Sequence, residues 1–217
     1  MECPMDDDLF SMFEKRIDEA FEQYDSYFPL LHYALYAPLQ GILAEAGGGI
    51  SCKKGCSRCC SRIVVASRLE ALALIDYIYA FTDFDREGAN VQIAEHAALL
   101  RGFLDERSGA GDGDAVWFEK NIPCPFLRGD ICSVYEGRPL SCRLYHSLDD
   151  PELCARPVRG VAELPLLSDA EKLFRILARK ISARIDPSLE VNGVLTIMMD
   201  EFIESGAFKK EDPSPGQ

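Results

Sequence analysis

Residues 52–60 read Cys52-Lys53-Lys54-Gly55-Cys56-Ser57-Arg58-Cys59-Cys60, which places four cysteines in nine positions. The C-x2-C step from Cys56 to Cys59 lets two sulfurs converge on one ion. Gly55 permits the tight turn that this step needs. Adjacent side chains point to opposite faces of an extended backbone, so Cys59 and Cys60 could serve two centres, or one could bind while the other packs. The run indicates a thiolate-rich metal site in a loop.

A second cysteine-bearing segment lies within residues 115–146, which read as loop-like sequence. Its cysteines are separated by seven and nine residues, so each suits a single ligand brought in by its own turn, at Gly129-Asp130 or Gly137. The predicted metal ligands from both segments are Cys52, Cys56, Cys59, Cys60, Cys124, Cys132 and Cys142. Since one tetrahedral site takes about four ligands, we expect either one four-cysteine centre with spare thiols or two metals that share ligands.

The residue types also restrict the metal and its surroundings. Soft sulfur ligands select zinc or iron, the latter including a 4Fe-4S cluster. Residues 52–68 contain five basic residues and no acidic one, although the chain as a whole has a net charge of −13. Cationic neighbours lower thiol pKa values and offset the charge of bound thiolates. The basic residues are Lys53, Lys54, Arg58, Arg62 and Arg68.

The remaining composition limits the compartment and the partners. Nine cysteines cannot all pair within one chain, and the isolated Cys3 and Cys154 are expected to be small buried hydrophobes. The N-terminus lacks a secretory pattern, and no apolar run reaches the about 18–20 residues of a membrane span. We therefore expect a cytoplasmic protein with reduced thiols and no membrane contact. Its net charge of −13 argues against nucleic-acid binding, and no feature identifies a protein partner.

Hydrophobic periodicity predicts a mainly α fold, a single compact helical domain over 1–210 in which the two cysteine-rich loops converge. The cysteine-cluster region spans about 50–146, and the tail 211–217 is predicted to be disordered. Capping-box patterns start two of the helices, at Ser67-Arg68-Leu69-Glu70 and Ser168-Asp169-Ala170-Glu171. The expected helices cover 7–25, 30–46 with a kink at its prolines, 68 onward, 86–107, 168–185 and 188–205. A short extended piece is expected at 63–65 and a loop at 108–114.

Several residues near the cysteines have more than one interpretation. His146 follows Cys142 in a Cys-x3-His step and could join the site or be an ordinary loop histidine. Arg138 and Arg143 could donate to sulfurs or to a bound anion, or could form ordinary ion pairs. Tyr135 and Tyr145 are expected to belong to the core. His32 and His96 lie within helical patterns and are expected to pack or to lie on the surface.

The cysteine pattern resembles the YkgJ-type cysteine-cluster family, named for its CxxCxxCC motif and described as zinc- or iron-chelating. The resemblance rests on the run 52–60, on Cys124-Pro125-Phe126-Leu127 and on Cys132-Ser133-Val134-Tyr135-Glu136 followed by Arg138-Pro139-Leu140-Ser141-Cys142-Arg143. It covers roughly residues 50–146. The first gap, from Cys52 to Cys56, holds three residues where the motif has two. The resemblance implies that the protein's partner is a zinc or iron ion.

Two alternative functions remain open at this stage. The same cysteine pattern is similar to that of flagellin lysine N-methylases, which implies an S-adenosylmethionine-using protein-lysine methyltransferase with an iron–sulfur centre. The chain is short for such an enzyme and shows no glycine-rich methyl-donor motif after a strand. A thiol-redox protein that uses Cys59-Cys60 is the other alternative, although no thioredoxin-like pattern surrounds that pair.

Overall fold

Helices make up most of the described chain, which in the computed structural model comprises residues 7–45, 50–107, 113–155 and 165–207. The mainly α prediction is confirmed. The helices are α1 (Asp7–Gln23), α2 (Tyr27–Leu31), α3 (Ala37–Glu45), α4 (Arg68–Phe81), α5 (Arg86–Glu106), α6 (Gly113–Glu119), α7 (Leu140–Leu144), α8 (Pro165–Ile185) and α9 (Leu195–Ser205).

The strands are short and form two antiparallel pairs. In the first, β1 (Val65–Ser67) pairs with β4 (Asn192–Val194), which joins two segments far apart in the sequence. In the second, β2 (Leu127–Arg128) and β3 (Ile131–Cys132) form a hairpin. Three 3₁₀ turns complete the described structure: Tyr135–Gly137, Pro151–Ala155 and Pro187–Glu190.

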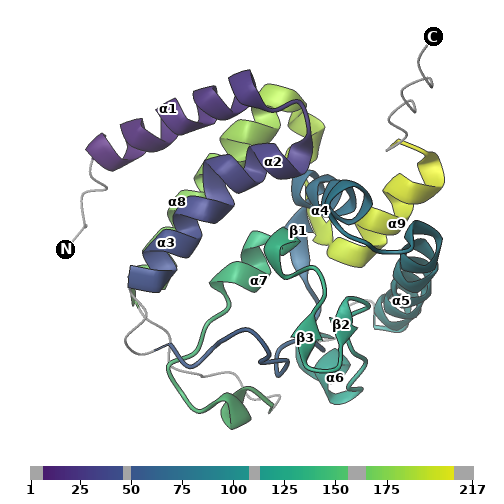
Figure 1. The fold of residues 1–217 in the computed structure, drawn as a ribbon. Coiled ribbons are helices and arrows are strands. Elements are labelled where there is room, and N and C mark those ends of the chain that lie inside the picture. Colours follow the sequence, from purple (N-terminus) through teal and green to yellow (C-terminus); the bar gives the residue numbers. More distant parts are fainter. Residues whose placement is uncertain (1–6, 46–49, 108–112, 156–164, 208–217) are drawn as a thin grey trace.

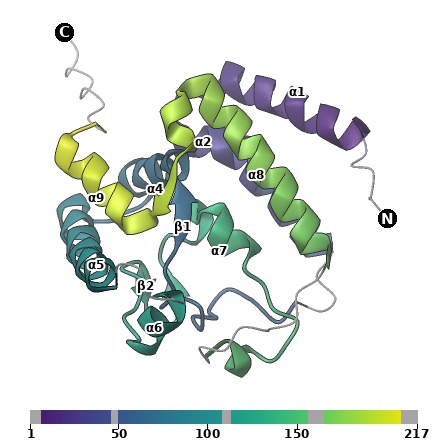
Figure 2. The same ribbon diagram turned by 180° about the vertical axis from the view of Figure 1, so that it is seen from behind.

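The helices form two groups, and the cysteine segments lie below and between them (Figures 1 and 2). In the first group, α1 and α8 pack through Phe13 and Phe174, whose ring centroids are 5.3 Å apart. In the second group, Arg101 on α5 forms a 2.6 Å ion pair with Asp200 on α9. Helix α4 lies between the groups and contacts α2 and α9.

Helix α4 is buried on nearly all sides, so its polar N-terminus needs internal partners. The Ser67 side chain accepts a hydrogen bond from the Glu70 amide, and the Glu70 carboxylate accepts one from the Ser67 amide at 2.9 Å. This confirms the predicted capping box. Glu70 itself is only 4 % exposed, so both capping contacts lie inside the protein.

The main hydrophobic core takes side chains from the described helices other than α6. A smaller cluster of Leu100, Phe103 and Trp117 packs between α5 and α6. The division into a domain over 1–210 and a tail stays a prediction. Cys3 and residues 211–217 lie outside the described residues.

The segment predicted as a helix around 30–46 is helical from Tyr27 to Glu45, with an irregular centre. A π-helical turn, His32–Tyr36, separates α2 from α3. Pro38 has no amide hydrogen and cannot complete the regular α-helical hydrogen bond to residue 34. The wider turn next to Pro38 fits the irregularity expected from the prolines.

Four other boundaries differ from the expectations. The extended piece expected at 63–65 is β1, at Val65–Ser67. Within the loop expected at 108–114, α6 already begins at Gly113. Helix α8 begins at Pro165 rather than at the Ser168 capping box, since proline favours the first helical position. The segment 188–205 is helical only from Leu195, because residues 192–194 pair with β1.

Candidate metal centre

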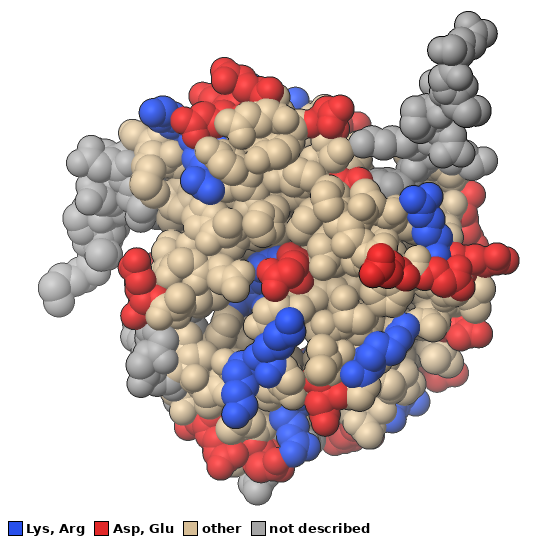
Figure 3. Space-filling view, viewed as in Figure 1, with Lys and Arg blue, Asp and Glu red and all other residues tan. Residues whose placement is uncertain are grey.

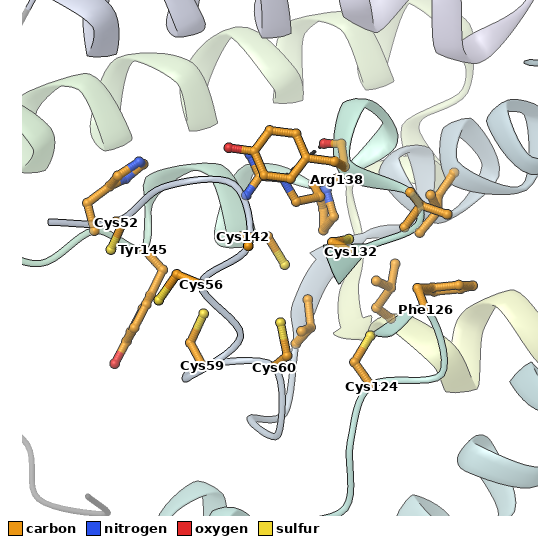
Figure 4. A pocket seen from close by; sticks show the side chains of 18 of the residues that line it. Cys52, Cys56, Cys59, Cys60, Cys124, Phe126, Cys132, Arg138, Cys142 and Tyr145 are labelled. Carbon is orange, nitrogen blue, oxygen red and sulfur yellow. Dashed lines mark hydrogen bonds between the residues drawn. The ribbon is translucent and has the colours of Figure 1, made fainter. Parts of the chain in front are cut away.

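All seven clustered cysteines line one cavity of about 110 Å³ (Figure 4). The loop before β1 supplies Cys52, Cys56, Cys59 and Cys60. The second segment supplies one thiol from a loop, one from β3 and one from α7: Cys124, Cys132 and Cys142. Segments separated by more than sixty residues in the sequence therefore face the same space.

Tight turns shape the first segment. The Cys56 amide donates to the Lys53 carbonyl at 3.0 Å, and the Cys60 amide donates to the Ser57 carbonyl at 2.9 Å. Gly55 has a φ of +93°, a backbone conformation that side-chain-bearing residues rarely adopt. The predicted role of Gly55 in the turn is therefore observed.

Direct hydrogen bonds join the two cysteine segments. The Cys124 amide donates to the Cys60 carbonyl at 2.7 Å. The Ser57 hydroxyl donates to the Asp130 carboxylate, also at 2.7 Å, in the β2–β3 turn. These bonds fix the backbones on opposite sides of the cavity independently of any metal.

Backbone amides also contact the sulfurs. The Ser147 amide donates to the Cys52 sulfur at 3.3 Å. Burial raises the thiol pKa values of Cys124 and Cys132, and the amides of Phe126 and Val134, each two residues after a cysteine, partly oppose that rise. Such bonds stabilise the thiolate form, which is the form that binds metal.

A buried carboxylate positions α7, which carries Cys142. The Leu140 amide, at the first residue of α7, donates to Glu70 Oε1 at 2.6 Å. Glu70 thus accepts backbone hydrogen bonds at the N-termini of both α4 and α7. The sequence identified Glu70 as part of a capping box, but its contact with Leu140, seventy residues away, had no signal in the sequence.

Burial raises the pKa of several thiols, which corrects the expectation that basic neighbours lower them. Burial raises the pKa of Cys124 and that of Cys142 to about 12 each. For Cys59, a hydrogen bond with Cys60 is the main cause of a raised pKa, and burial adds to it. Without a metal, these three thiols are therefore protonated at neutral pH.

The basic residues of the first segment are largely paired with acidic side chains from elsewhere. Arg62 forms an ion pair with Asp114 at 2.8 Å, and Arg68 forms one with Glu201 at 3.7 Å. Arg58 pairs with Glu152. Lys and Arg side chains group on the lower half of the face in Figure 3, with acidic side chains among them.

The cation that most affects the thiols comes from the second segment. Arg138 lines the cavity, and its charge lowers the pKa of Cys132 and of Cys142, although burial outweighs that effect. Its Nε atom donates to the Tyr135 carbonyl at 2.9 Å, which holds the guanidinium beside the cavity.

The two tyrosines expected in the core lie beside the cysteines instead. Tyr135 and Tyr145 are partly exposed and line the cavity instead of joining the buried core. His146 lines it too. By contrast, His96 packs on Trp117, away from the cysteines. Cys154 is 5 % exposed, as expected for a small buried residue.

The thiols surround the cavity without forming a ready-made ligand set. Within the described residues, no three His, Cys, Asp or Glu side chains are grouped closely enough to hold an ion. Zinc–sulfur bonds are about 2.3 Å long, so loading requires the cysteine side chains to rotate inward. The donor chemistry fits zinc or iron, because thiols are the soft ligands that these metals accept.

The comparisons with known proteins agree with this donor set. A family model described as "CxxCxxCC: Putative zinc- or iron-chelating domain" matches residues 51–159, about half of the chain. No curated protein and no solved structure matches the chain. No helix in the described ranges is long and apolar enough to cross a membrane. By the family match, the chain belongs to the CxxCxxCC family of zinc- or iron-chelating domains.

Proposed function

We propose that this protein is a cytoplasmic metal-binding protein that holds zinc or iron, the latter including an iron–sulfur cluster, in the seven-cysteine cavity. The observation that carries the proposal is that both cysteine segments line the same cavity. The proposed ligands are drawn from Cys52, Cys56, Cys59, Cys60, Cys124, Cys132 and Cys142.

Cys59 is the best candidate for a ligand that joins the two segments. Its charge raises the pKa values of four other thiols, one from its own segment and three from the other: Cys52, Cys124, Cys132 and Cys142. A metal that binds Cys59 would therefore be close to thiols on both sides. It would replace the electrostatic repulsion between thiolates with shared coordination.

Metal binding would also explain why so many thiols are partly buried together. Protonated thiols with raised pKa values are poor ligands, but a divalent ion deprotonates a coordinating thiol outright. The release of protons on binding makes the affinity strongly pH-dependent. Neutral pH is therefore compatible with a loaded site, even though burial raises the pKa of thiols such as Cys124 and Cys142.

Anaerobic purification followed by elemental analysis and an absorbance spectrum tests the proposal. A brown protein with iron, sulfide and absorption near about 400 nm indicates an iron–sulfur centre, whereas a colourless protein with stoichiometric zinc indicates a zinc site. A folded protein that contains neither metal, and takes up neither on reconstitution, would contradict the proposal.

The geometry favours neither alternative function. Thiol-redox chemistry at Cys59 needs a thiolate, but its hydrogen bond with Cys60 and its burial raise the pKa of Cys59. For a methyltransferase, no feature of the described residues points to S-adenosylmethionine. We therefore propose metal binding alone.

A further inference from the structure

A second cavity, of about 240 Å³, lies beside the cysteine cavity. The two share four lining residues: Cys52, Tyr135, Arg138 and His146. The far wall of the second cavity is formed mainly by α3 and is largely apolar, through Leu39, Leu43, Ala44 and Ile50, with Gln40 as its polar member. Metal binding by the cysteines does not use this wall.

The charge on the described lining of this second cavity is entirely positive. Arg138 and Arg143 contribute it, and no Asp or Glu is among the lining residues. Neither arginine forms an ion pair with a carboxylate in the described part of the chain. By contrast, Arg58, Arg62 and Arg101 each form an ion pair with a carboxylate.

Arg143 is the less usual of the two arginines, because it is only 4 % exposed. Its Nε atom donates to the Arg138 carbonyl at 2.7 Å, and its Nη2 atom donates to the Glu136 carbonyl. Its guanidinium lies 4.1 Å from the centre of the Tyr36 ring. These neutral partners hold the side chain in place, and the Glu136 carboxylate acts on its charge without forming an ion pair with it.

A buried charge that forms no ion pair is costly, so an anion in the cavity would be favoured. The guanidinium fork matches a carboxylate, which accepts two parallel hydrogen bonds. The apolar side chains of α3 suit a short hydrocarbon body. We propose that the second cavity binds a small organic carboxylate, with its head toward Arg138 and Arg143 and its apolar part against α3.

The competing explanation is that the arginines only balance the thiolates of the cysteine cavity. Charge balance involves Arg138 but gives the apolar wall of α3 no role. The two explanations therefore predict different results for a substitution on α3. If the cavity binds a carboxylate, the substitution blocks that ligand. If the arginines only balance the thiolates, the substitution has no effect, because the charge around the thiolates is unchanged.

A ligand-observed NMR titration of the full chain, purified anaerobically, tests the proposal with 4-methylpentanoate as the probe. The matching alcohol, 4-methylpentan-1-ol, and inorganic phosphate are titrated at the same ionic strength. We expect saturable binding of the carboxylate, and binding of the alcohol about tenfold or more weaker, since hydrogen bonds to charged groups are the strong ones. Phosphate, which lacks the apolar body, is expected to bind more weakly than the carboxylate.

Two single substitutions locate the site, and a third is the matched control. Ala44→Trp fills the cavity from its α3 wall, and Arg138→Gln removes one positive charge. Each should weaken carboxylate binding by about tenfold or more. Gly41→Trp adds the same bulk to the same helix at a position that does not line the cavity and has open space. It should bind the probe like the unmodified protein.

Three results would overturn the carboxylate site: no saturable binding, equal binding of the alcohol, or unchanged binding in Ala44→Trp. Stronger binding of phosphate than of the carboxylate would overturn it as well. Metal content, measured in the same samples, keeps this test apart from the metal proposal. Ala44→Trp should lose the carboxylate while it keeps its metal.

Discussion

Cys59 is a residue whose charge affects the thiol pKa values of both cysteine segments. It follows the turn begun at Gly55, contacts Cys60 and affects thiols from both segments. Adjacent Cys59 and Cys60 had two interpretations in the sequence, as ligands of separate centres or as a ligand beside a packing residue. Both side chains line the same cavity, so the structure brings them to one space instead of to opposite sides.

Replacement of Cys59 tests its proposed position between the segments. Cys59→Ser removes the soft ligand and should lower metal affinity by more than about 100-fold, beyond the 10–100-fold effects of groups that only orient ligands. Competition with a chromophoric chelator measures this. Cys154→Ala, at a buried cysteine that does not line the cavity, should change the affinity little. Equal losses in the two variants would contradict the assignment.

His96 offers a second test at the residue scale, away from the metal site. Its ring contacts Thr196 Oγ1 at 3.1 Å, and burial lowers the pKa of His96 to about 4. In the unfolded chain the pKa returns to about 6.5. The unfolded state thus binds more protons between these values, and stability falls as the pH drops from about 6.5 to about 4.

The loss attributable to His96 should be about 2 kcal/mol, after allowance for its partial exposure. Urea unfolding at pH 7 and pH 4.5, in the same metal state, measures it. His96→Gln lacks the titrating group and should show a smaller fall over this range. If both proteins lost the same free energy, protonation of His96 would not be the cause.

At the scale of elements, α4 and α7 are connected through one buried carboxylate. Glu70 accepts hydrogen bonds from Ser67 at the start of α4 and from the Leu140 amide at the start of α7. The hydroxyl of Ser141 on α7 also donates to the Val65 carbonyl of β1. Cys142 is therefore carried on a helix whose position depends on α4 and β1.

Glu70→Gln tests that connection. One carboxylate oxygen becomes an amide group that faces backbone donors, so a buried hydrogen bond is lost and the free energy of unfolding should fall by about 2 kcal/mol. Chemical denaturation measures the change. Glu87→Gln makes the same substitution in the first turn of α5, at an exposed residue, and should cost less than about 0.5 kcal/mol. Similar losses would show that the buried contacts of Glu70 add nothing specific.

At the scale of the whole molecule, different interactions stabilise the main core and the cysteine cavity. The core is formed by apolar side chains from the described helices other than α6. The cavity is held by turns, the Cys60–Cys124 backbone contact and amide–sulfur bonds. The helical groups therefore do not depend directly on a metal, whereas the cysteine segments gain an added cross-link from one.

Metal removal should weaken the protein without abolishing its helices. A ligand present at 100 times its Kd stabilises a protein by about 2.7 kcal/mol, which corresponds to roughly 5–10 °C in Tm at this size. Thermal unfolding followed by circular dichroism, with and without chelator, measures the shift. Hydrogen exchange should increase mainly in the cysteine segments. Loss of the helical signal at low temperature would contradict a metal-independent core.

The helical fold was largely predictable because its signals are local. The apolar spacing of α1 and α5 and the Ser67–Glu70 capping box lie within single helices, and each is observed. The expectation failed where distant segments decide the structure. Residues 192–194 were included in a predicted helix, yet they form β4 because β1 supplies their hydrogen-bond partners.

The sequence by itself determined that the protein is mainly helical, that its thiols are clustered and that their donor chemistry suits zinc or iron. These properties follow from residue type and short spacing. Only the tertiary structure decided the electrostatics. Three arginines of the basic run are paired by Asp114, Glu152 and Glu201, while burial raises the pKa of thiols such as Cys142 and encloses Arg143 without an ion pair in the described part of the chain. Burial and long-range pairing depend on which segments meet, and spacing along a chain does not encode that directly.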